Sequence, residues 1–473
     1  MPIAWVQLGV LFTGLLSYPL VKEADPDFWW HLRTGELVFH GGIPRDDPFS
    51  WTAAGHAWVA HEWLSELLIY GVESMLGYWA NVLLFGGVVI AALLLMYRLG
   101  RSSGAGTKPL VLLMYLSVAT LGLYVTVRPQ EFTWLLFAVF VYILQRHYAG
   151  ERAPLWALPP LMALWANLHL GFVYGLMLVG AWCAALAFDR ARGGAADLRG
   201  AAVIAAACVV AACLNPHGPA LLWYPVRYFF EGQADRQFVR EWQHPDIRVI
   251  PQQLIFLADA LLAGALLLRT RPRPFLFIVT LASVALSLQA LRNAPFVALL
   301  LLPVAGPAIA ARWPSASRAA DSRTRVSIAL VLAVAIVIAG SVGVVAARRG
   351  TSIALGDPSE RGYPQGGAAY VRAHEAGKRL FNEYSWGGYL IEVLYPGTPV
   401  FIDGRADFYG NRILNDYATI YRTRPGWEEL FAHYDPEVVL VAKAAPIAAA
   451  LRADARWREA FTGERESVFV RAD

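Results

Sequence analysis

The sequence has few charged residues for its length. They make up 16% of its 473 residues, against about 25% in typical soluble domains, so the chain cannot cover a water-facing surface on all sides. Hydrophobic residues make up 57% and gather in long runs. These properties exclude an ordinary soluble enzyme and predict an all-α polytopic membrane protein.

Cysteine is scarce as well, and no cluster of basic residues with interleaved aromatics is present. Cys183, Cys208 and Cys213 all fall inside apolar segments, where cysteine behaves as a small buried hydrophobic residue. Their spacing fits no zinc motif, and the polar loops contain no pair for a disulfide. The net charge of +4 is small, and without a basic cluster we expect no nucleic-acid partner.

Eleven apolar runs are long enough, at roughly 17 to 25 residues, to cross a bilayer as helices. The first lacks the basic start and small-residue cleavage site of a signal peptide, so we expect it to be a retained span. Two boundaries rest on very short breaks, so ten or twelve spans would also fit. The runs cover 3–21, 78–98, 109–127, 131–148, 154–169, 171–189, 199–214, 252–269, 274–291, 294–311 and 327–347.

Basic residues assign the two sides of the membrane. Five connections between the runs are rich in Arg and Lys, and they alternate along the chain: "RLGRSSGAGTK", "QRHYAGER", "DRARGGAADLR", "RTRPR" and "RWPSASRAADSRTR". The positive-inside rule places these five in the cytoplasm. The other connections and the tail then lie outside, and the basic pair Arg348–Arg349 is the one exception to the pattern.

The composition changes near residue 350. From there the chain alternates short apolar strands, such as "EVVLVA" and "SVFVRA", with helical stretches and turn residues. This pattern predicts a small extracytoplasmic α/β domain. We therefore divide the chain into a transmembrane domain, residues 1–349 with a first outer loop at 22–77, and a C-terminal domain, residues 350–473.

The first outer loop is long and patterned. "DFWWHLRTGELVFHG" and "HEWLSELLIYGVESML" repeat apolar residues at helical spacing, which predicts two amphipathic helices lying in the membrane interface. The stretch between them is dense in Gly, Pro, Asp and Ser, which is typical of turns. Trp29 and Trp30 suit the aromatic belt of a membrane interface.

Polar residues that are costly in a membrane protein gather on the outer face. Asp25 and Asp27 form either a functional pair or an N-terminal cap of the helix that follows. His61 and Glu62 are either a metal or acid–base pair or ordinary polarity on a helix surface. Arg128 and Arg292 end apolar helices on the side that basic residues avoid, which predicts an anionic partner, a carboxylate or a phosphate. The remaining candidates are His31, Glu131, Asn167, His169 and His217.

The pattern "DPDFWWHLRTG…IPRDDPFSWT…HEWLSELL", with "VRPQEF", "NLHLGF" and "NPHG" downstream, resembles the GT-C superfamily of integral-membrane glycosyltransferases. It is similar to a bacterial branch of that superfamily, as is the tail motif "NEYSWGGYL…PVFIDGRADFYG". The resemblance covers nearly the whole architecture, whereas the individual motifs are short. It implies a multi-pass protein of the bacterial inner membrane with its C-terminal domain outside.

The resemblance implies transfer of a sugar from a polyprenyl-phosphate donor to an extracytoplasmic glycan, lipid or protein acceptor. Asp25 or Asp27 matches the position of the aspartate that takes the acceptor proton in such enzymes, with Asp25 the closer match. An inverting transfer needs this base and positive charge for the departing phosphate, which Arg128 and Arg292 could supply with His169 and His217 as donors. In metal-dependent members, Asp25, Asp27 and Glu131 would suit Mg²⁺ or Mn²⁺.

Two other functions compete with this one. A transporter or flippase of lipid-linked saccharides would place polar residues at mid-depth and show an internal repeat. A non-catalytic scaffold would tolerate replacement of the outer-face residues. In the tail, Asp403, Arg405 and Asp407 alternate in "FIDGRADFYG", either to bind an acceptor or to close a salt-bridged loop.

Overall fold

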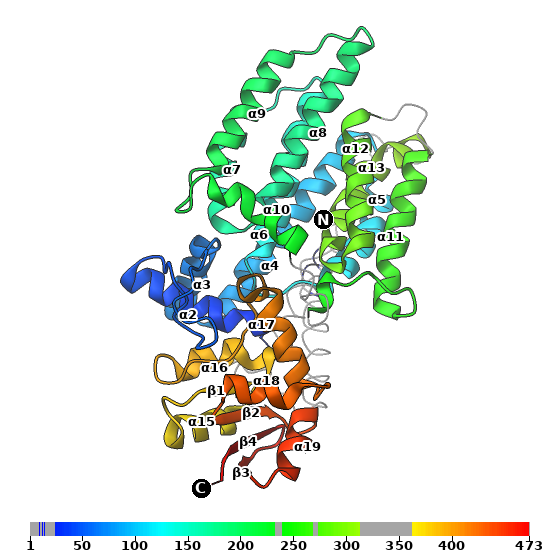
Figure 1. Ribbon diagram of the computed structural model, residues 1–473. Coiled ribbons are helices and arrows are strands. Elements are labelled where there is room, and N and C mark those ends of the chain that lie inside the picture. The colour runs from blue at the N-terminus through cyan, green and yellow to red at the C-terminus, as the bar shows by residue number, and fades with distance from the viewer. Residues whose placement is uncertain are drawn as a thin grey trace. The chain divides into compact units, whose positions relative to one another are not determined.

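The computed structural model describes residues 24–231, 239–267, 273–312 and 362–472, with residues 9, 12 and 14. Figure 1 labels their helices and strands, which fall in two compact units. Among the described residues, 79–222, 239–267 and 273–312 form the first unit, a helical bundle. The second unit combines 24–78, 223–231 and 362–472. The predicted span 327–347, and 3–21 apart from those three residues, lie outside the described residues.

The bundle is formed by apolar helices. Every predicted apolar run from 78–98 to 294–311 coincides with one of them, which confirms the expectation of helices there. Three have the length and composition of a membrane span, Tyr78–Ser102, Phe172–Ala191 and Leu291–Arg312, so the number of crossings stays a prediction. The helices are α4 (Tyr78–Ser102), α5 (Thr107–Gly122), α6 (Gln130–Tyr148), α7 (Leu158–Leu168), α8 (Phe172–Ala191), α9 (Leu198–Ala212), α11 (Ile250–Leu267), α12 (Pro274–Gln289) and α13 (Ala294–Arg312), with the short turns η1 (Leu155–Ala157), η3 (Arg240–Trp242) and η4 (Leu291–Asn293).

Helix α13 is largely buried within the bundle. It packs against α5, α11 and α12, and its residues from Val297 to Leu302 are fully buried. Gly100 on α4 lies so close to it that a Cβ there would be 2.7 Å from the Leu302 carbonyl oxygen. Small residues that let two helix backbones approach are the usual means of packing helices in membranes.

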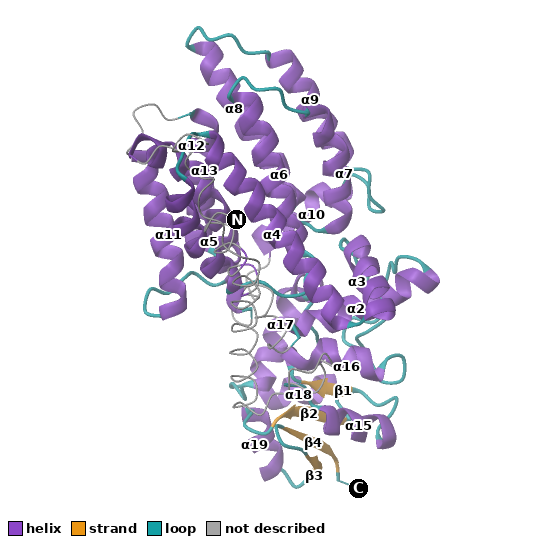
Figure 2. Ribbon diagram, turned by 180° about the vertical axis from the view of Figure 1, so that it is seen from behind, coloured by secondary structure: helices purple, strands orange, loops and turns teal. Residues whose placement is uncertain are grey.

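The second unit holds all the described strands (Figure 2). Its sheet has the order β1-β2-β4-β3, with β1 parallel to β2 and the other pairs antiparallel. Residues Val438–Val441 of β2 are fully buried, which explains why this strand is a continuous apolar run rather than an alternating one. The predicted α/β tail comprises α15 (Gln365–His374), β1 (Leu380–Asn382), η7 (Tyr384–Trp386), α16 (Gly387–Leu394), α17 (Ala406–Tyr421), α18 (Trp427–Tyr434), β2 (Val438–Ala442), α19 (Pro446–Ala453), β3 (Trp457–Thr462) and β4 (Glu466–Arg471).

The first outer loop is part of this second unit. Its two predicted helices are present as α2 (Pro26–Gly41) and α3 (Trp63–Leu76), and α2 packs against α16. Main-chain hydrogen bonds pair the loop with the tail: the Trp51 N–H donates to the Val400 carbonyl at 3.1 Å, and the Val400 N–H donates to the Phe49 carbonyl at 3.0 Å. The domain boundary predicted from composition placed this loop with the transmembrane domain. Composition does not reveal main-chain pairing between segments that are distant in the sequence.

Trp29 and Trp30 are buried inside the second unit, at 5% and 7% exposure. Trp29 lies edge-to-face against Tyr363 and Tyr389, with ring centroids 5.5 Å apart in both pairs. The expectation of a lipid-facing aromatic belt is therefore wrong for these two residues. Rings from the tail cover Trp29, and the Trp30 ring lies edge-to-face against Trp58 of the same loop. The local sequence reveals neither contact.

Candidate functional site

The acidic pair lies at the N-terminus of α2. Asp25 is the N-cap, and its Oδ1 accepts the Asp27 N–H at 3.0 Å. The Trp30 indole N–H donates to Asp27 Oδ1 at 3.1 Å. The tail loop passes so near that a Cβ on Gly404 would lie 1.9 Å from the same oxygen. The capping alternative is thus confirmed for Asp25, and both carboxylates remain partly exposed.

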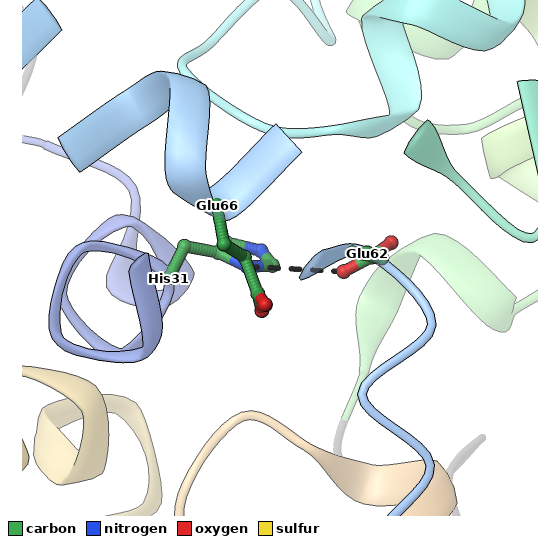
Figure 3. Close-up of side chains that lie close together, drawn as sticks. All are labelled: His31, Glu62 and Glu66. Carbon is green, nitrogen blue, oxygen red and sulfur yellow. Dashed lines mark hydrogen bonds and ion pairs between the residues drawn. The ribbon is translucent and has the colours of Figure 1, made fainter. Parts of the chain in front are cut away.

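Helices α2 and α3 bring a histidine and two glutamates together (Figure 3). Gly35 makes this possible, because a Cβ there would lie 2.1 Å from the Glu66 carbonyl oxygen. His31 Nδ1 is 3.2 Å from Glu66 Oε1 and 3.8 Å from Glu62 Oε2. We call His31, Glu62 and Glu66 the α2–α3 cluster; their donor atoms all lie within 4.8 Å of one another.

Glu66 is the most enclosed member of the α2–α3 cluster. Its residue exposure is 1%, and its Oε2 has no hydrogen-bond partner among the residues that the structure describes. Burial raises the pKa of the Glu66 carboxyl well above its usual range, and the Glu62 carboxylate raises it further. An oxygen buried in this way is stabilised by a proton, a cation or an ordered water.

A second acid–histidine contact lies beside this cluster. His61 Nε2 is 3.5 Å from Asp407 Oδ2 on α17, and the Tyr224 hydroxyl, on α10 (Ala220–Glu231), donates to the same oxygen at 2.7 Å. Burial alone would raise the pKa of Asp407, but hydrogen bonds from His61 and Tyr224 hold it below its usual value. Asp407 is therefore an ionised carboxylate with a histidine in contact.

A buried ion pair joins the tail to the first loop. The Arg405 guanidinium donates to Asp403 at 2.6 Å and 2.8 Å, and to Asp47 Oδ1 at 2.8 Å. All three side chains are at most 1% exposed. Of the two alternatives for this tail motif, the salt-bridged loop is confirmed for Asp403 and Arg405, and Asp47 is the partner that closes it.

In the helical bundle, both predicted arginines have an acidic neighbour on η3. Arg128 pairs with Glu241 through two contacts of 3.2 Å and 3.3 Å, and Arg292 lies over the Trp242 ring, 4.0 Å from its centroid. Burial would raise the pKa of Glu241, but Arg128 and Arg292 hold it below its usual value. The anionic partner expected for the arginines is thus, in this structure, a carboxylate of the same chain.

Glu131 and His169 are buried near the ends of their helices. Glu131 Oε1 accepts the Thr126 N–H at 2.6 Å. His169 Nδ1 lies 2.8 Å from Thr133 Oγ1 and accepts the Gly171 N–H at 2.9 Å. These bonds fix the chain at the starts of α6 and α8, and a role in substrate binding stays a prediction.

Asn167 lies in the last turn of α7, and His217 lies in the turn that follows α9. The Asn167 amide donates to the Leu214 carbonyl at 2.8 Å, which ties these turns together. The His217 N–H donates to Asn215 Oδ1 at 2.8 Å, so the turn after α9 is also closed locally. Their contacts are those of helix-end residues, and substrate binding by them also stays a prediction.

The carboxylates suited to Mg²⁺ or Mn²⁺ fall in both units. Asp25 and Asp27 belong to the second unit, and Glu131 belongs to the bundle. One oxygen of each already accepts a hydrogen bond. This ligand set therefore stays a prediction, whereas the α2–α3 cluster is assembled within one unit.

Sequence reasoning did not place Glu66, Tyr224 or Glu241 among the candidate site residues. Glu66 carried a usable signal, because it follows Glu62 by four residues and so lies on the same helix face. Asp407 stood out in the tail motif without its partners, and Tyr224 and Glu241 had no local signal at all. Their partners lie far away in the chain, so only the fold could identify them.

No family model and no curated protein matches the sequence. The fold is similar to that of the Archaeoglobus fulgidus oligosaccharyltransferase in its apo form, at 12% identity and TM-score 0.54 over 93% of this chain and 69% of that one. The complex of the same archaeal enzyme, AglB, with an inhibitory peptide and a dolichol-phosphate gives 11% identity and TM-score 0.57, at the same coverages.

A third similar structure is the arabinofuranosyltransferase AftD from Mycobacteria. It gives 13% identity and TM-score 0.55, over 99% of this chain and 42% of that one. At these identities the likeness concerns the fold, and it agrees with the resemblance seen in the first-loop and tail motifs. The chain therefore has a fold similar to those of the archaeal oligosaccharyltransferase and of AftD.

Proposed function

We propose that the protein is a membrane glycosyltransferase that moves a sugar from a polyprenyl-phosphate donor to an extracytoplasmic acceptor. The fold supports the general reaction, because the similar archaeal enzyme is an oligosaccharyltransferase with a dolichol-phosphate bound in one structure. Polar residues at the ends of apolar helices also suit a substrate that is half lipid and half sugar. The sugar donor, the bilayer and an acceptor glycan, lipid or protein are the partners in this reaction.

The observation that carries the proposal is the charge arrangement around Glu241. Arg128, in the bend before α6, pairs with Glu241, and Arg292 of η4 also lowers the pKa of that carboxylate, so this place in the bundle stabilises an anion. A donor phosphate would make the same charge-assisted hydrogen bonds to Arg128 and Arg292. Positive charge held there would also stabilise the phosphate as it leaves the sugar.

The first-loop aspartates supply the base in this proposal. An acceptor hydroxyl gives its proton to Asp25 or Asp27 as it attacks the anomeric carbon, and the donor phosphate departs from the opposite face with inversion. Such a base contributes about 10² to 10⁴-fold to the rate. Any Mg²⁺ or Mn²⁺ would add to the positive charge around the phosphate.

The test uses the full-length protein in nanodiscs with a panel of polyprenyl-phosphate-linked sugars and radiolabelled sugar transfer as the readout. Arg128→Gln should weaken donor use, because it removes one of the two cations. Arg312→Gln is the matched control, because Arg312 is exposed in the last turn of α13. Transfer by Arg128→Gln at the rate of the control would contradict the phosphate role, and binding of donor by wild type without any transfer would favour the transporter hypothesis.

A further inference from the structure

The α2–α3 cluster has the donor atoms of a transition-metal site. One imidazole nitrogen and two carboxylates face one another from two helices of the same unit. Glu62 immediately precedes α3 and Glu66 lies in its first turn, so the two carboxylates are four residues apart and share one face. His31 projects toward them from α2 (Figure 3).

The spacing of these atoms suits simultaneous coordination. Ligand atoms that are each about 2.1 Å from one metal ion lie about 3.0 to 3.4 Å from each other in octahedral or tetrahedral geometry. The separation of His31 Nδ1 and Glu66 Oε1 is 3.2 Å, and that of His31 Nδ1 and Glu62 Oε2 is 3.8 Å. A small rotation of the Glu62 side chain would bring the third ligand into range.

Charge and burial give an independent reason to expect a cation. Glu66 Oε2 is buried and, within the described part of the chain, has no hydrogen-bond partner, which is costly for a carboxylate. The nearby Arg405 is engaged by Asp47 and Asp403, at 2.8 Å and 2.6 Å. A divalent ion would balance the two glutamates, while the neutral imidazole adds no charge.

We propose that His31, Glu62 and Glu66 bind one divalent transition-metal ion, Zn²⁺ or Mn²⁺. Imidazole nitrogen favours these ions over Mg²⁺ and Ca²⁺, and carboxylates disfavour soft ions such as Cu⁺. Three protein ligands leave coordination positions open, as in zinc sites that also bind water or a substrate. His61 Nδ1 lies 3.9 Å from Glu62 Oε1, so a second imidazole borders the cluster. This inference does not depend on the proposed transfer reaction.

The alternative occupant of the cluster is a proton. A protonated Glu66 beside His31 would also satisfy the buried oxygen and would need no metal. The two alternatives differ in a measurable way, because only the metal site gives a saturable binding isotherm that requires the glutamate and the histidine together.

The test uses full-length protein in detergent micelles, stripped with EDTA, dialysed, and titrated with ZnCl₂ or MnCl₂ by calorimetry. Electron paramagnetic resonance of Mn²⁺ and elemental analysis give the stoichiometry. We expect one equivalent of metal to bind to wild type. Both Glu66→Gln and His31→Asn should bind the metal at least about tenfold more weakly. Bound metal should also raise the unfolding midpoint of wild type and leave that of the variants unchanged.

The matched control is Glu73→Gln, on α3 but outside the cluster, and it should bind as wild type does. Two variants on different helices keep the test informative if one of them fails to fold. Absence of binding to wild type up to about 1 mM metal would overturn the proposal in favour of the shared proton. Wild-type affinity in both Glu66→Gln and His31→Asn would overturn it too, by placing the ion elsewhere.

Discussion

Replacing Arg405 by methionine should strongly destabilise the second unit. Arg405→Met keeps the length and the apolar stem of the side chain but removes the guanidinium. That group donates to Asp47 and Asp403, and all three side chains are at most 1% exposed. The two carboxylates would remain buried without their cation.

The size of the effect follows from this burial. Breaking a buried ion pair by removing one partner costs about 3 to 5 kcal/mol, because the other charge is left uncompensated. The guanidinium also lies 4.7 Å from the centroid of the Trp58 ring and 5.0 Å from that of Phe49, and losing these contacts adds about 1 kcal/mol. For a unit of this size, each kcal/mol lowers the unfolding midpoint by about 2 to 4 °C, so the combined loss of about 4 to 6 kcal/mol predicts a decrease of about 8 to 24 °C.

The assay is thermal unfolding of the full-length protein, followed by intrinsic tryptophan fluorescence. Arg412→Met is the control, because Arg412 lies on the same helix, α17, and is exposed. Adding Asp47→Asn and Asp403→Asn to Arg405→Met should recover part of the lost stability, since the stranded charges are then gone. A midpoint for Arg405→Met equal to that of the control would refute the reasoning.

Three further predictions concern the acidic residues. Asp25→Asn and Asp27→Asn should retain the helix cap and the Trp30 contact, because an amide oxygen also accepts hydrogen bonds. Whichever variant has lost the catalytic base should transfer sugar about 10² to 10⁴-fold more slowly. Unchanged transfer in both variants would exclude the proposed base. Glu241→Gln should tighten binding of a polyprenyl-phosphate donor and so lower its KM, because the carboxylate that competes with the phosphate for the arginines is neutralised. A raised KM would instead make Glu241 a substrate ligand. Burial raises the pKa of Glu392 to about 7, so the stability that this residue contributes is complete below about pH 4.5 and is lost as the pH rises through 7. The unfolding midpoint of wild type should therefore decline between pH 5 and pH 8, and Glu392→Gln should abolish this decline. An equal decline in both proteins would refute the prediction.

Apolar runs were sufficient to predict the helices of the bundle, because a membrane-spanning helix must bury its backbone polar groups and expose apolar side chains over its whole length. The positions of α2 and α3 followed equally well from helical periodicity in the first loop. The strands of the tail could be expected too, since "EVVLVA" and "SVFVRA" are short apolar segments between turn residues.

Tertiary structure alone decided which polar residues meet. Trp29 has the sequence context of an interfacial residue, yet rings from the tail enclose it. Asp47 lies in a plain turn motif, and its partner is 358 residues away. Arg128 was expected to face an anion. The sequence around Glu241 has no distinguishing pattern, so only the fold identifies Glu241 as that anion.

The sequence by itself therefore determined the class of protein, the helices and the residue types available for chemistry, because hydrophobic periodicity is a local property. The pairing of His31 with Glu66 was decided by Gly35, where the missing side chain lets α3 approach α2. Such contacts depend on how two elements pack in three dimensions, and no window along the chain contains that information.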